Sequence, residues 1–374
     1  MRLSFPVYFL FIAINIYPAG FNPDTSCVTI IFAGDIMGHD AQILGAYNPE
    51  TKKYNYESTF RYVKPYIENA DIAIGNLEVT LAGPPYKGYP RFSSPDNLAI
   101  AAKRAGFDIL VNANNHALDR GEKGFRRTLH ILDSLNIIHT GTFRSNKERV
   151  LNYPLIFEKH NIKIALLNYT YGTNSLKIDT PCIINSIDTL IIRQDLEKAK
   201  SANPDYIIVA IHWGVEYERY ENKIQQKLAG FMLNNGADAI IGSHPHVIQP
   251  IVNYYPAESD SSYFNIVVYS LGNFISNQRA QYKDGGIIFE FTLMKTPTVT
   301  KVADYRYMPA WVYREAKKDK SCFYILPVRL FYENEQYFNF SDNDKYKINR
   351  FYNDTKELLK NIPESQFYMD YKIE

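Results

Sequence analysis

The chain has little cysteine. Cys27, Cys182 and Cys322 stand far apart among 374 residues, so they form no disulfide framework and do not suggest a cysteine-based structural zinc site. An excess of charge of one sign is also lacking, because 41 basic residues balance 40 acidic ones. No basic run with interleaved aromatic residues occurs, and we therefore expect no nucleic-acid partner. A glycine-rich phosphate loop and internal repeats are absent as well.

The N-terminus carries a short apolar stretch. Arg2 precedes apolar residues 5–16, and the small residues Pro18-Ala19-Gly20 follow. This order is typical of a secretory signal peptide, here over residues 1–20. About a dozen residues are short for a membrane span, which needs about 20, but an uncleaved anchor stays open. We expect an exported protein that is periplasmic, extracellular or anchored to the membrane.

Five short apolar runs have the length of β-strands, and each ends in polar residues. Helical periodicity occupies intervals between them, over 96–105, 124–135 and 219–233. Strands that alternate with helices predict an α/β fold with parallel or mixed sheets and helices outside. Ligands bind at the carboxyl ends of strands in such sheets, so we expect the polar groups to converge. These groups are Asp35, Glu78, Asn115 with His116, His212, and His244 with His246.

The chemistry of these groups is that of a metal site. Neutral imidazole is the commonest metal ligand, and carboxylate, amide and imidazole groups together suit Mn, Fe or Zn rather than Ca. A turn with solvated histidines could explain a single phrase such as Gly242-Ser243-His244-Pro245-His246. Five such phrases at equivalent places favour a shared site for one or two divalent metal ions.

Six phrases, in this order along the chain, resemble the capsule-synthesis CapA family. That family is associated with poly-γ-glutamate capsule production and is similar to the calcineurin-like metallophosphoesterases. The resemblance implies an α/β/β/α sandwich, with two mixed sheets flanked by helices. The phrases are Gly34-Asp35-Ile36-Met37, Gly75-Asn76-Leu77-Glu78, Asn114-Asn115-His116-Ala117-Leu118-Asp119, His212-Trp213-Gly214-Val215-Glu216, Gly242-Ser243-His244-Pro245-His246-Val247 and Tyr269-Ser270-Leu271-Gly272-Asn273-Phe274.

The resemblance also implies roles within a two-metal site. Asp35 and His246 would bind the first metal, Glu78 would bridge both, and His116 would point at the substrate. The second metal would be held by Asn115, His212 and His244.

The sequence departs from the wider phosphoesterase pattern at two positions. Met37 stands where those enzymes commonly have histidine, and Glu78 stands where they commonly bridge with aspartate. The first metal site is therefore short of a ligand, which His39 or water would supply.

Three further residues are candidates for the surroundings of the site. Asp119 follows His116 by three residues and either orients its imidazole or caps the next helix. Glu216 either lines the same pocket as His212 or is an exposed carboxylate at a helix start. Asn273 is expected in a turn near the site.

Two functions follow as expectations. The first is a metal-dependent hydrolase of the cell envelope, in which an activated hydroxide attacks a phosphoester or amide-type bond of an exported polymer. The second is a non-catalytic accessory protein of a capsule-synthesis membrane complex, with a vestigial metal site. Apart from Met37, the proposed ligands keep metal-binding side chains, which favours the enzyme. We expect the catalytic domain over 21–330, with late strands at 286–293, 301–308 and 321–330, and a polar, tyrosine-rich C-terminal appendage over 331–374.

Overall fold

The computed structural model describes residues 25–365 except 178–180, 257–262, 336–337 and 339. The signal peptide predicted for residues 1–20 lies outside this range. None of the described helices is long and apolar enough to cross a membrane. All three cysteines are free thiols.

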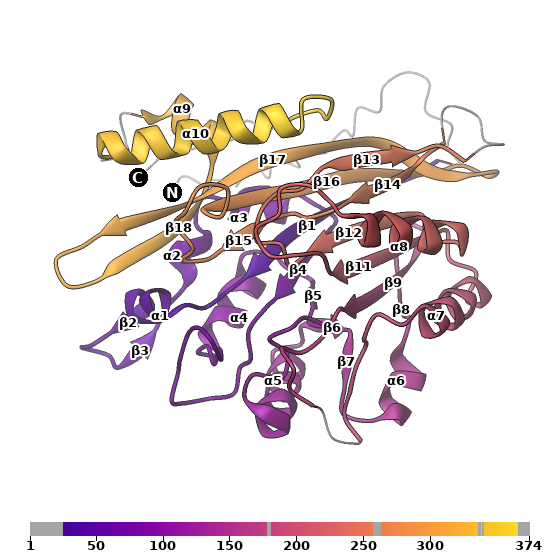
Figure 1. Ribbon diagram of the computed structural model, residues 1–374, viewed down its shortest axis with the longest axis horizontal. Coiled ribbons are helices and arrows are strands. Elements are labelled where there is room, and N and C mark those ends of the chain that lie inside the picture. Colours follow the sequence, from indigo (N-terminus) through magenta and orange to yellow (C-terminus); the bar gives the residue numbers. More distant parts are fainter. Residues whose placement is uncertain (1–24, 178–180, 257–262, 336–337, 339, 366–374) are drawn as a thin grey trace, which may run out of the picture.

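Two mixed sheets form the centre of the protein (Figure 1). The first has the order β18-β17-β16-β1-β4-β5-β6, with β15 paired to β1, and the second has the order β13-β14-β12-β11-β9-β8. In the first sheet β1, β4, β5 and β6 are parallel neighbours, and in the second β9, β11, β12 and β14 are. The strands of the first sheet are β1 (Ser26–Ile36), β4 (Ile72–Leu77), β5 (Ile109–Val111), β6 (Ile138–Thr140), β15 (Asn273–Ile275), β16 (Gly285–Lys295), β17 (Thr300–Ala316) and β18 (Ser321–Pro327). The strands of the second are β8 (Leu155–Lys159), β9 (Ile162–Thr170), β11 (Tyr206–His212), β12 (Ala239–Ser243), β13 (Ile251–Tyr254) and β14 (Asn265–Val268).

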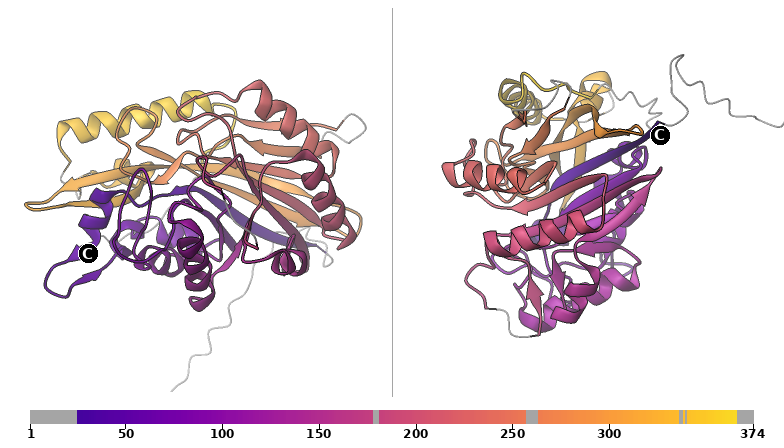
Figure 2. Two further views of the ribbon diagram at one scale, coloured as in Figure 1. Left: turned by 60° about the horizontal axis from the view of Figure 1, so that its bottom comes forward. Right: turned by 90° about the vertical axis from the view of Figure 1, so that its right-hand side faces the viewer.

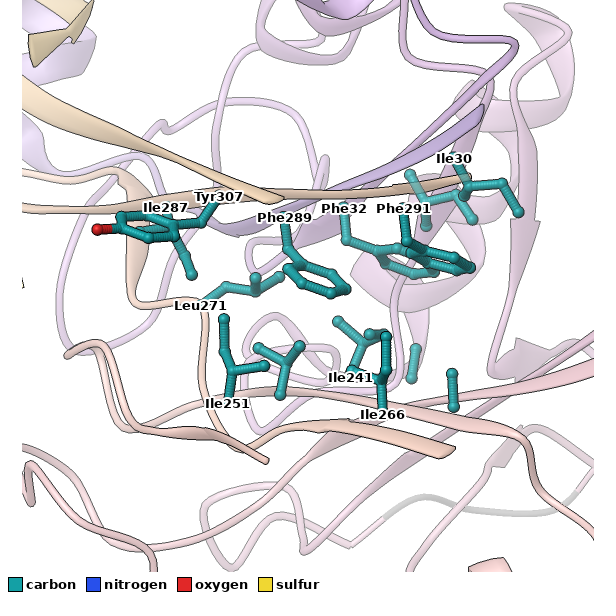
Figure 3. Packing of buried hydrophobic residues seen from close by; sticks show 14 of the residues in the cluster. Ile30, Phe32, Ile241, Ile251, Ile266, Leu271, Ile287, Phe289, Phe291 and Tyr307 are labelled. Atoms are coloured by element: carbon teal, nitrogen blue, oxygen red, sulfur yellow. The ribbon is translucent and has the colours of Figure 1, made fainter. Parts of the chain in front are cut away.

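The sheets pack face to face because both faces of their strands carry apolar residues. Along β1, Ile30 and Phe32 join the cluster between the sheets, whereas Ile31 and Ala33 join the cluster on the outer face. This is the period of two that a strand imposes on its side chains. Figure 3 shows the inner layer, where Phe32, Phe289 and Phe291 of the first sheet lie above Ile241 and Ile266 of the second.

Helices cover the outer faces of both sheets (Figure 2). Residues of α2, α3 and α4 pack on the first sheet, and residues of α7 and α8 pack on the second. The helices are α1 (Asp40–Ala46), α2 (Glu57–Phe60), α3 (Lys64–Glu68), α4 (Asn97–Arg104), α5 (Gly121–Ser134), α6 (Asn146–Asn152), α7 (Thr189–Ser201), α8 (Lys223–Asn234), α9 (Val328–Glu333) and α10 (Asp342–Leu358). Two short strand pairs complete the described elements, β2 (Tyr47–Asn48) with β3 (Lys53–Tyr54) and β7 (Thr142–Phe143) with β10 (Ile183–Ile184).

The C-terminal segment packs on the main core. Figure 1 shows α10 running alongside β17, and its residues Ile348 and Phe351 belong to the same apolar cluster as Trp311 of β17. Burial of such a side chain contributes about 1.5–3 kcal/mol relative to exposure. Helix α10 is therefore held to the sheet by substantial apolar burial.

The α/β class and the sandwich of two mixed sheets flanked by helices are confirmed. The three predicted helices correspond to α4, α5 and α8, whose ends lie within four residues of the predicted ones. The late strands correspond to β16, β17 and β18. The last of them is shorter than predicted, because Pro327 has no amide hydrogen to continue the ladder and α9 begins at Val328.

Candidate metal centre

The candidate ligands lie where parallel strands of both sheets end. Asp35 is near the end of β1, Glu78 directly follows β4, and Asn115 follows β5 after a short turn. From the second sheet, His212 is the last residue of β11, and His244 directly follows β12. The pairing of β1 shifts register at Asp35, and such bulges re-aim side chains next to functional sites.

Two groups of buried side chains share Glu78. Asp35, Glu78 and His246 form the first, and Glu78, His212 and His244 form the second, with potential ligand atoms within 4.8 Å of one another in each group. His246 Nδ1 lies 2.9 Å from Asp35 Oδ2, and its Nε2 lies 3.8 Å from Glu78 Oε1. Since an imidazole binds a cation through one nitrogen, one of these nitrogens would face the cation together with the two carboxylates.

Asn115 joins the second group. Its Oδ1 lies 2.9 Å from His212 Nε2, and the same Nε2 lies 3.4 Å from Glu78 Oε1. The other ring nitrogen of His212 is 3.0 Å from the hydroxyl of Ser243. Ser243 therefore fixes the ring so that Nε2 faces Glu78 and Asn115.

Glu78 is the test of whether these residues fit a metal. Its side chain is fully buried, and neither carboxylate oxygen has a partner of hydrogen-bond geometry among the described residues. Its nearest polar neighbours are themselves candidate ligands, His212 at 3.4 Å and the carboxylate of Asp35. Burial, and then the neighbouring carboxylate of Asp35, raise the pKa of Glu78 well above its usual value. Buried carboxylates in proteins are otherwise paired or coordinate metals. Divalent cations at the two groups would satisfy both oxygens, so the donor set fits.

The imidazoles are in the protonation state that a metal requires. Burial lowers the pKa of His244 to about 3, with the nearby His246 adding to the effect. Burial also lowers the pKa of His212 well below its usual value, with His244 and His246 contributing. His244 Nδ1 is a further buried atom without a partner in the described part of the chain. Both rings are therefore neutral at pH 7 and can donate a lone pair.

The turn after β12 is strained in a way that serves the site. His244 has φ +100° and His246 has φ +58°, which is the left-handed region that side chains other than glycine rarely adopt. Such conformations cost of order 1–3 kcal/mol each and cluster at functional sites. They let two rings separated by one residue turn toward different members of the site.

His116 lies beside the centre without joining either group. Its Nδ1 is 2.8 Å from Asp119 Oδ2, which also accepts a hydrogen bond from the Phe92 amide at 2.6 Å. No side chain caps α5, whose N-cap is Arg120. Of the two roles considered for Asp119, its contacts are those of a carboxylate that orients His116.

The remaining candidates lie around the centre. His39 Nδ1 is 3.1 Å from Gln42 Oε1, and His39 belongs to neither ligand group. Met37 is buried in the apolar cluster on the outer face of the first sheet. Glu216 is exposed, yet its charge contributes to the raised pKa of Glu78. Asn273 is buried, and its Nδ2 donates to the carbonyl of His246 at 3.3 Å.

Several residues around the site were not identified from the sequence. Asn76 Nδ2 donates to Asp35 Oδ1 at 2.8 Å and holds that carboxylate in place. The ring of Tyr171 lies 4.4 Å from that of His244, and the ring of Tyr217 lies 6.2 Å from that of His246. The two tyrosines are 46% and 44% exposed, so they mark the side of the centre that faces solvent. The apolar run before Tyr171 was a further available signal, since β9 ends at Thr170 like the other strands.

The family model for the bacterial capsule synthesis protein PGA_cap matches residues 29–278. The chain belongs to this family. All the candidate ligands of the PGA_cap-type site lie within the matched residues.

Two curated proteins are similar to this chain in sequence. The chain is 30% identical over 276 residues to the capsule biosynthesis protein CapA of Bacillus anthracis, covering 70% of this chain and 63% of that protein. It is 29% identical over 306 residues to the PGA biosynthesis protein CapA of Bacillus subtilis (strain 168), covering 78% and 75%. The chain thus spans slightly less than two thirds of the first relative and three quarters of the second.

Solved structures show more distant likenesses. The NAD nucleotidase of Haemophilus influenzae aligns with a TM-score of 0.49 at 12% identity, covering 92% of this chain and 65% of that one. The calcineurin-like phosphoesterase YfkN of Bacillus subtilis aligns with a TM-score of 0.43 at 13% identity, covering 90% and 99%. Likenesses at this level indicate nothing about the activity of the present PGA_cap member.

Proposed function

We propose that the protein is a metal-dependent hydrolase that acts on a phosphoester or amide-type bond of an exported envelope polymer. The observation that carries the proposal is Glu78, a fully buried carboxylate that belongs to both ligand groups and accepts no hydrogen bond from the described residues. The names of the family and of its relatives support a capsule polymer such as PGA as the substrate class.

In this proposal one set of residues binds the metal and another residue transfers a proton. When bound, a pair of divalent cations such as Mn, Fe or Zn would supply Lewis acidity and a hydroxide nucleophile at neutral pH. Asp35 and His246 would hold one cation and Asn115, His212 and His244 another, with Glu78 available to both because it belongs to both groups. Asn76 and Ser243 fix Asp35 and His212 by the hydrogen bonds described above.

His116 carries the proton in this scheme. Asp119 accepts from Nδ1–H, which leaves Nε2 to exchange a proton with the leaving group. The ring is buried, at 4% exposure, and lies close enough for its charge to affect His212 and His244. Asp119 thus acts as a positioning residue for a general acid.

The test is metal content measured beside hydrolysis. Metal-free protein is reconstituted with Mn, Fe or Zn, and bound metal is quantified while bis(p-nitrophenyl) phosphate and γ-glutamyl-p-nitroanilide are assayed. We expect one or two ions per chain in the wild type and loss of metal in His244→Ala. The matched control is His160→Ala, since His160 lies by Cys27 at the opposite end of β1 from Asp35. A wild type that binds none of these metals would contradict the proposal and leave the accessory role in a capsule-synthesis complex.

Export is part of the proposal, because the substrate is an envelope polymer. The order of charge, apolar stretch and small residues at the N-terminus supports it. We expect the mature protein to begin near Phe21 outside the cytoplasm, or to keep the stretch as a membrane anchor. N-terminal sequencing of protein from fractionated native cells decides this, and an intact Met1 in the cytoplasmic fraction would contradict export.

A further inference from the structure

A lysine without a carboxylate partner lies beside the candidate metal centre. Lys283 is half-buried in the segment between β15 and β16, and its Nζ stands 3.8 Å from the centre of the Tyr217 ring. Among the described residues, no carboxylate oxygen lies within 4.0 Å of this Nζ. A tyrosine face attracts a cation but does not neutralise it. The charge of Lys283 therefore remains available to an anion.

Lys283 lies close to the candidate metal centre. Because the Tyr217 ring lies 6.2 Å from the His246 ring, Lys283 Nζ is within 10.0 Å of the centre of that imidazole. Glu216 is the neighbouring acidic group. It helps raise the pKa of Tyr217 to about 12, chiefly an effect of burial, but it forms no ion pair with Lys283.

One buried amide connects this lysine to the ligand turn. Asn273 Nδ2 donates to the carbonyl of Lys283 at 2.8 Å and to the carbonyl of His246 at 3.3 Å. Asn273 itself pairs with Asp35 across β15 and β1. The backbone of Lys283 is thus fixed relative to two members of the first ligand group.

Helix α10 contacts the two segments that carry Lys283 and Tyr217. Gln281 Nε2 donates to Asp354 Oδ2 at 2.9 Å, and an Arg219 nitrogen donates to the Asp354 carbonyl at 3.1 Å. Arg350 of α10 lies 3.7 Å from the buried carboxylate of Asp284. These contacts join α10 to both segments that carry Lys283 and Tyr217. Neither Lys283 nor α10 falls within the residues matched by the family model, 29–278.

We propose that Lys283, whose Nζ lies within 10.0 Å of the His246 ring, binds an anionic group of the substrate, a carboxylate or a phosphate, at a site separate from the bond that reacts at the metal centre. The inference rests on the proposed function, because it uses the metal centre as the reference point. A cation at this distance from the metal centre would favour substrates with a second negative charge. The substrate class is then a polymer that carries repeated anionic groups, and Lys283 is a specificity-determining residue.

The test uses small anions of defined length on metal-loaded protein. Calorimetry measures the binding of α,ω-dicarboxylates from glutarate to suberate beside monocarboxylates of equal length, and a parallel series uses α,ω-bisphosphonates. We expect one series to bind about tenfold to a hundredfold more tightly than its singly charged counterparts, as a charge-assisted contact gives, and that series identifies the anion. Lys283→Gln should remove the advantage. Lys227→Gln, which removes the same charge from the exposed face of α8, should keep it.

The results distinguish a failure of the role of Lys283 from a failure of the metal centre. The inference is wrong if metal-loaded wild type shows no preference for doubly charged ligands, or if Lys283→Gln retains it with an unchanged melting temperature. Metal analysis of the same samples separates this from the proposed function. A wild type that takes up no metal contradicts both, whereas a metal-loaded protein without the preference contradicts the role of Lys283 alone. Tyr217→Leu provides a second variant, because removing the ring that supports Nζ should weaken the same preference.

Discussion

Replacing Glu78 with glutamine should affect the metal-free and the metal-loaded protein in opposite directions. In the metal-free protein the carboxylate is fully buried, lies next to Asp35 and accepts no hydrogen bond from the described residues. An unsatisfied buried polar group costs about 1–3 kcal/mol, and more when it is charged. Glutamine carries no charge at any pH and can donate to Asp35 without first binding a proton. We therefore expect metal-free Glu78→Gln to be more stable than metal-free wild type by about 1–3 kcal/mol.

With metal the order should reverse. A ligand present at 1,000 times its dissociation constant stabilises the folded state by about 4.1 kcal/mol, which exceeds the advantage of glutamine in the metal-free protein, and Glu78 belongs to both ligand groups. Added Mn or Zn should raise the melting temperature of the wild type and leave that of Glu78→Gln nearly unchanged.

Scanning calorimetry with a chelator and with metal measures both effects. Glu218→Gln is the matched control, because Glu218 is an exposed carboxylate whose replacement should change neither curve. If metal-free Glu78→Gln melted below the wild type, the carboxylate would be a structural partner and the argument for a metal would fail.

Three other outcomes are expected. His116→Ala should keep its metal, unlike His244→Ala, and should lower turnover by about 10²–10⁴-fold, as measured by metal content beside initial rates. Asp354→Ala should leave metal content unchanged and weaken the preference for doubly charged ligands in calorimetry, because Asp354 holds Gln281 in the segment before Lys283. Burial raises the pKa of Asp238 to about 6 from 3.8, so the folded protein binds more protons than the unfolded one and should lose stability as the pH rises from about 4 to about 6. Denaturant unfolding across this window should show the loss, at most about 3 kcal/mol by the usual value per pKa unit, and a flatter curve for Asp238→Asn.

The fold was predictable because its signals are local. Apolar runs of strand length alternate with helical periodicity, which predicts strands such as β1 and β11 that are buried beneath helices. The division into two sheets was implied by the family resemblance and not by this pattern. The alternation of Ile30 and Phe32 with Ile31 and Ala33 can be read from the sequence once both faces are known to be covered. The role of α10 could not be read in this way. Its composition is polar, and only Ile348, Phe351 and Thr355 are buried in it, which is a weak periodic signal.

The placement of the ligand candidates followed from strand ends and motif phrases, whereas their supporting contacts did not. Asn76 and Ser243 lie inside the quoted phrases, but whether an amide or hydroxyl contacts a carboxylate or an imidazole depends on register between strands. Asn76 pairs with Asp35 across β4 and β1, and Ser243 pairs with His212 across β12 and β11. Such cross-strand neighbours are fixed by pairing between residues dozens of positions apart, which a single sequence does not specify.

The candidate metal ligands and the proposed selecting residue Lys283 come from different parts of the chain. Every candidate ligand lies at or just after a strand and inside the family match, so the sheets fix the ligands whatever the substrate. Lys283 lies after the match, and α10, which supports its segment through Asp354 and Arg350, is later still. Changes in α10 should therefore affect Lys283 more directly than Glu78 or His212, which lie at the ends of β4 and β11 and, among the described residues, form no hydrogen bond or ion pair with that helix. On the two proposals, changes in the C-terminal segment would alter the charge that is recognised while the candidate ligands stay in place. Asp354→Ala beside His244→Ala measures whether the two functions are separable in this protein.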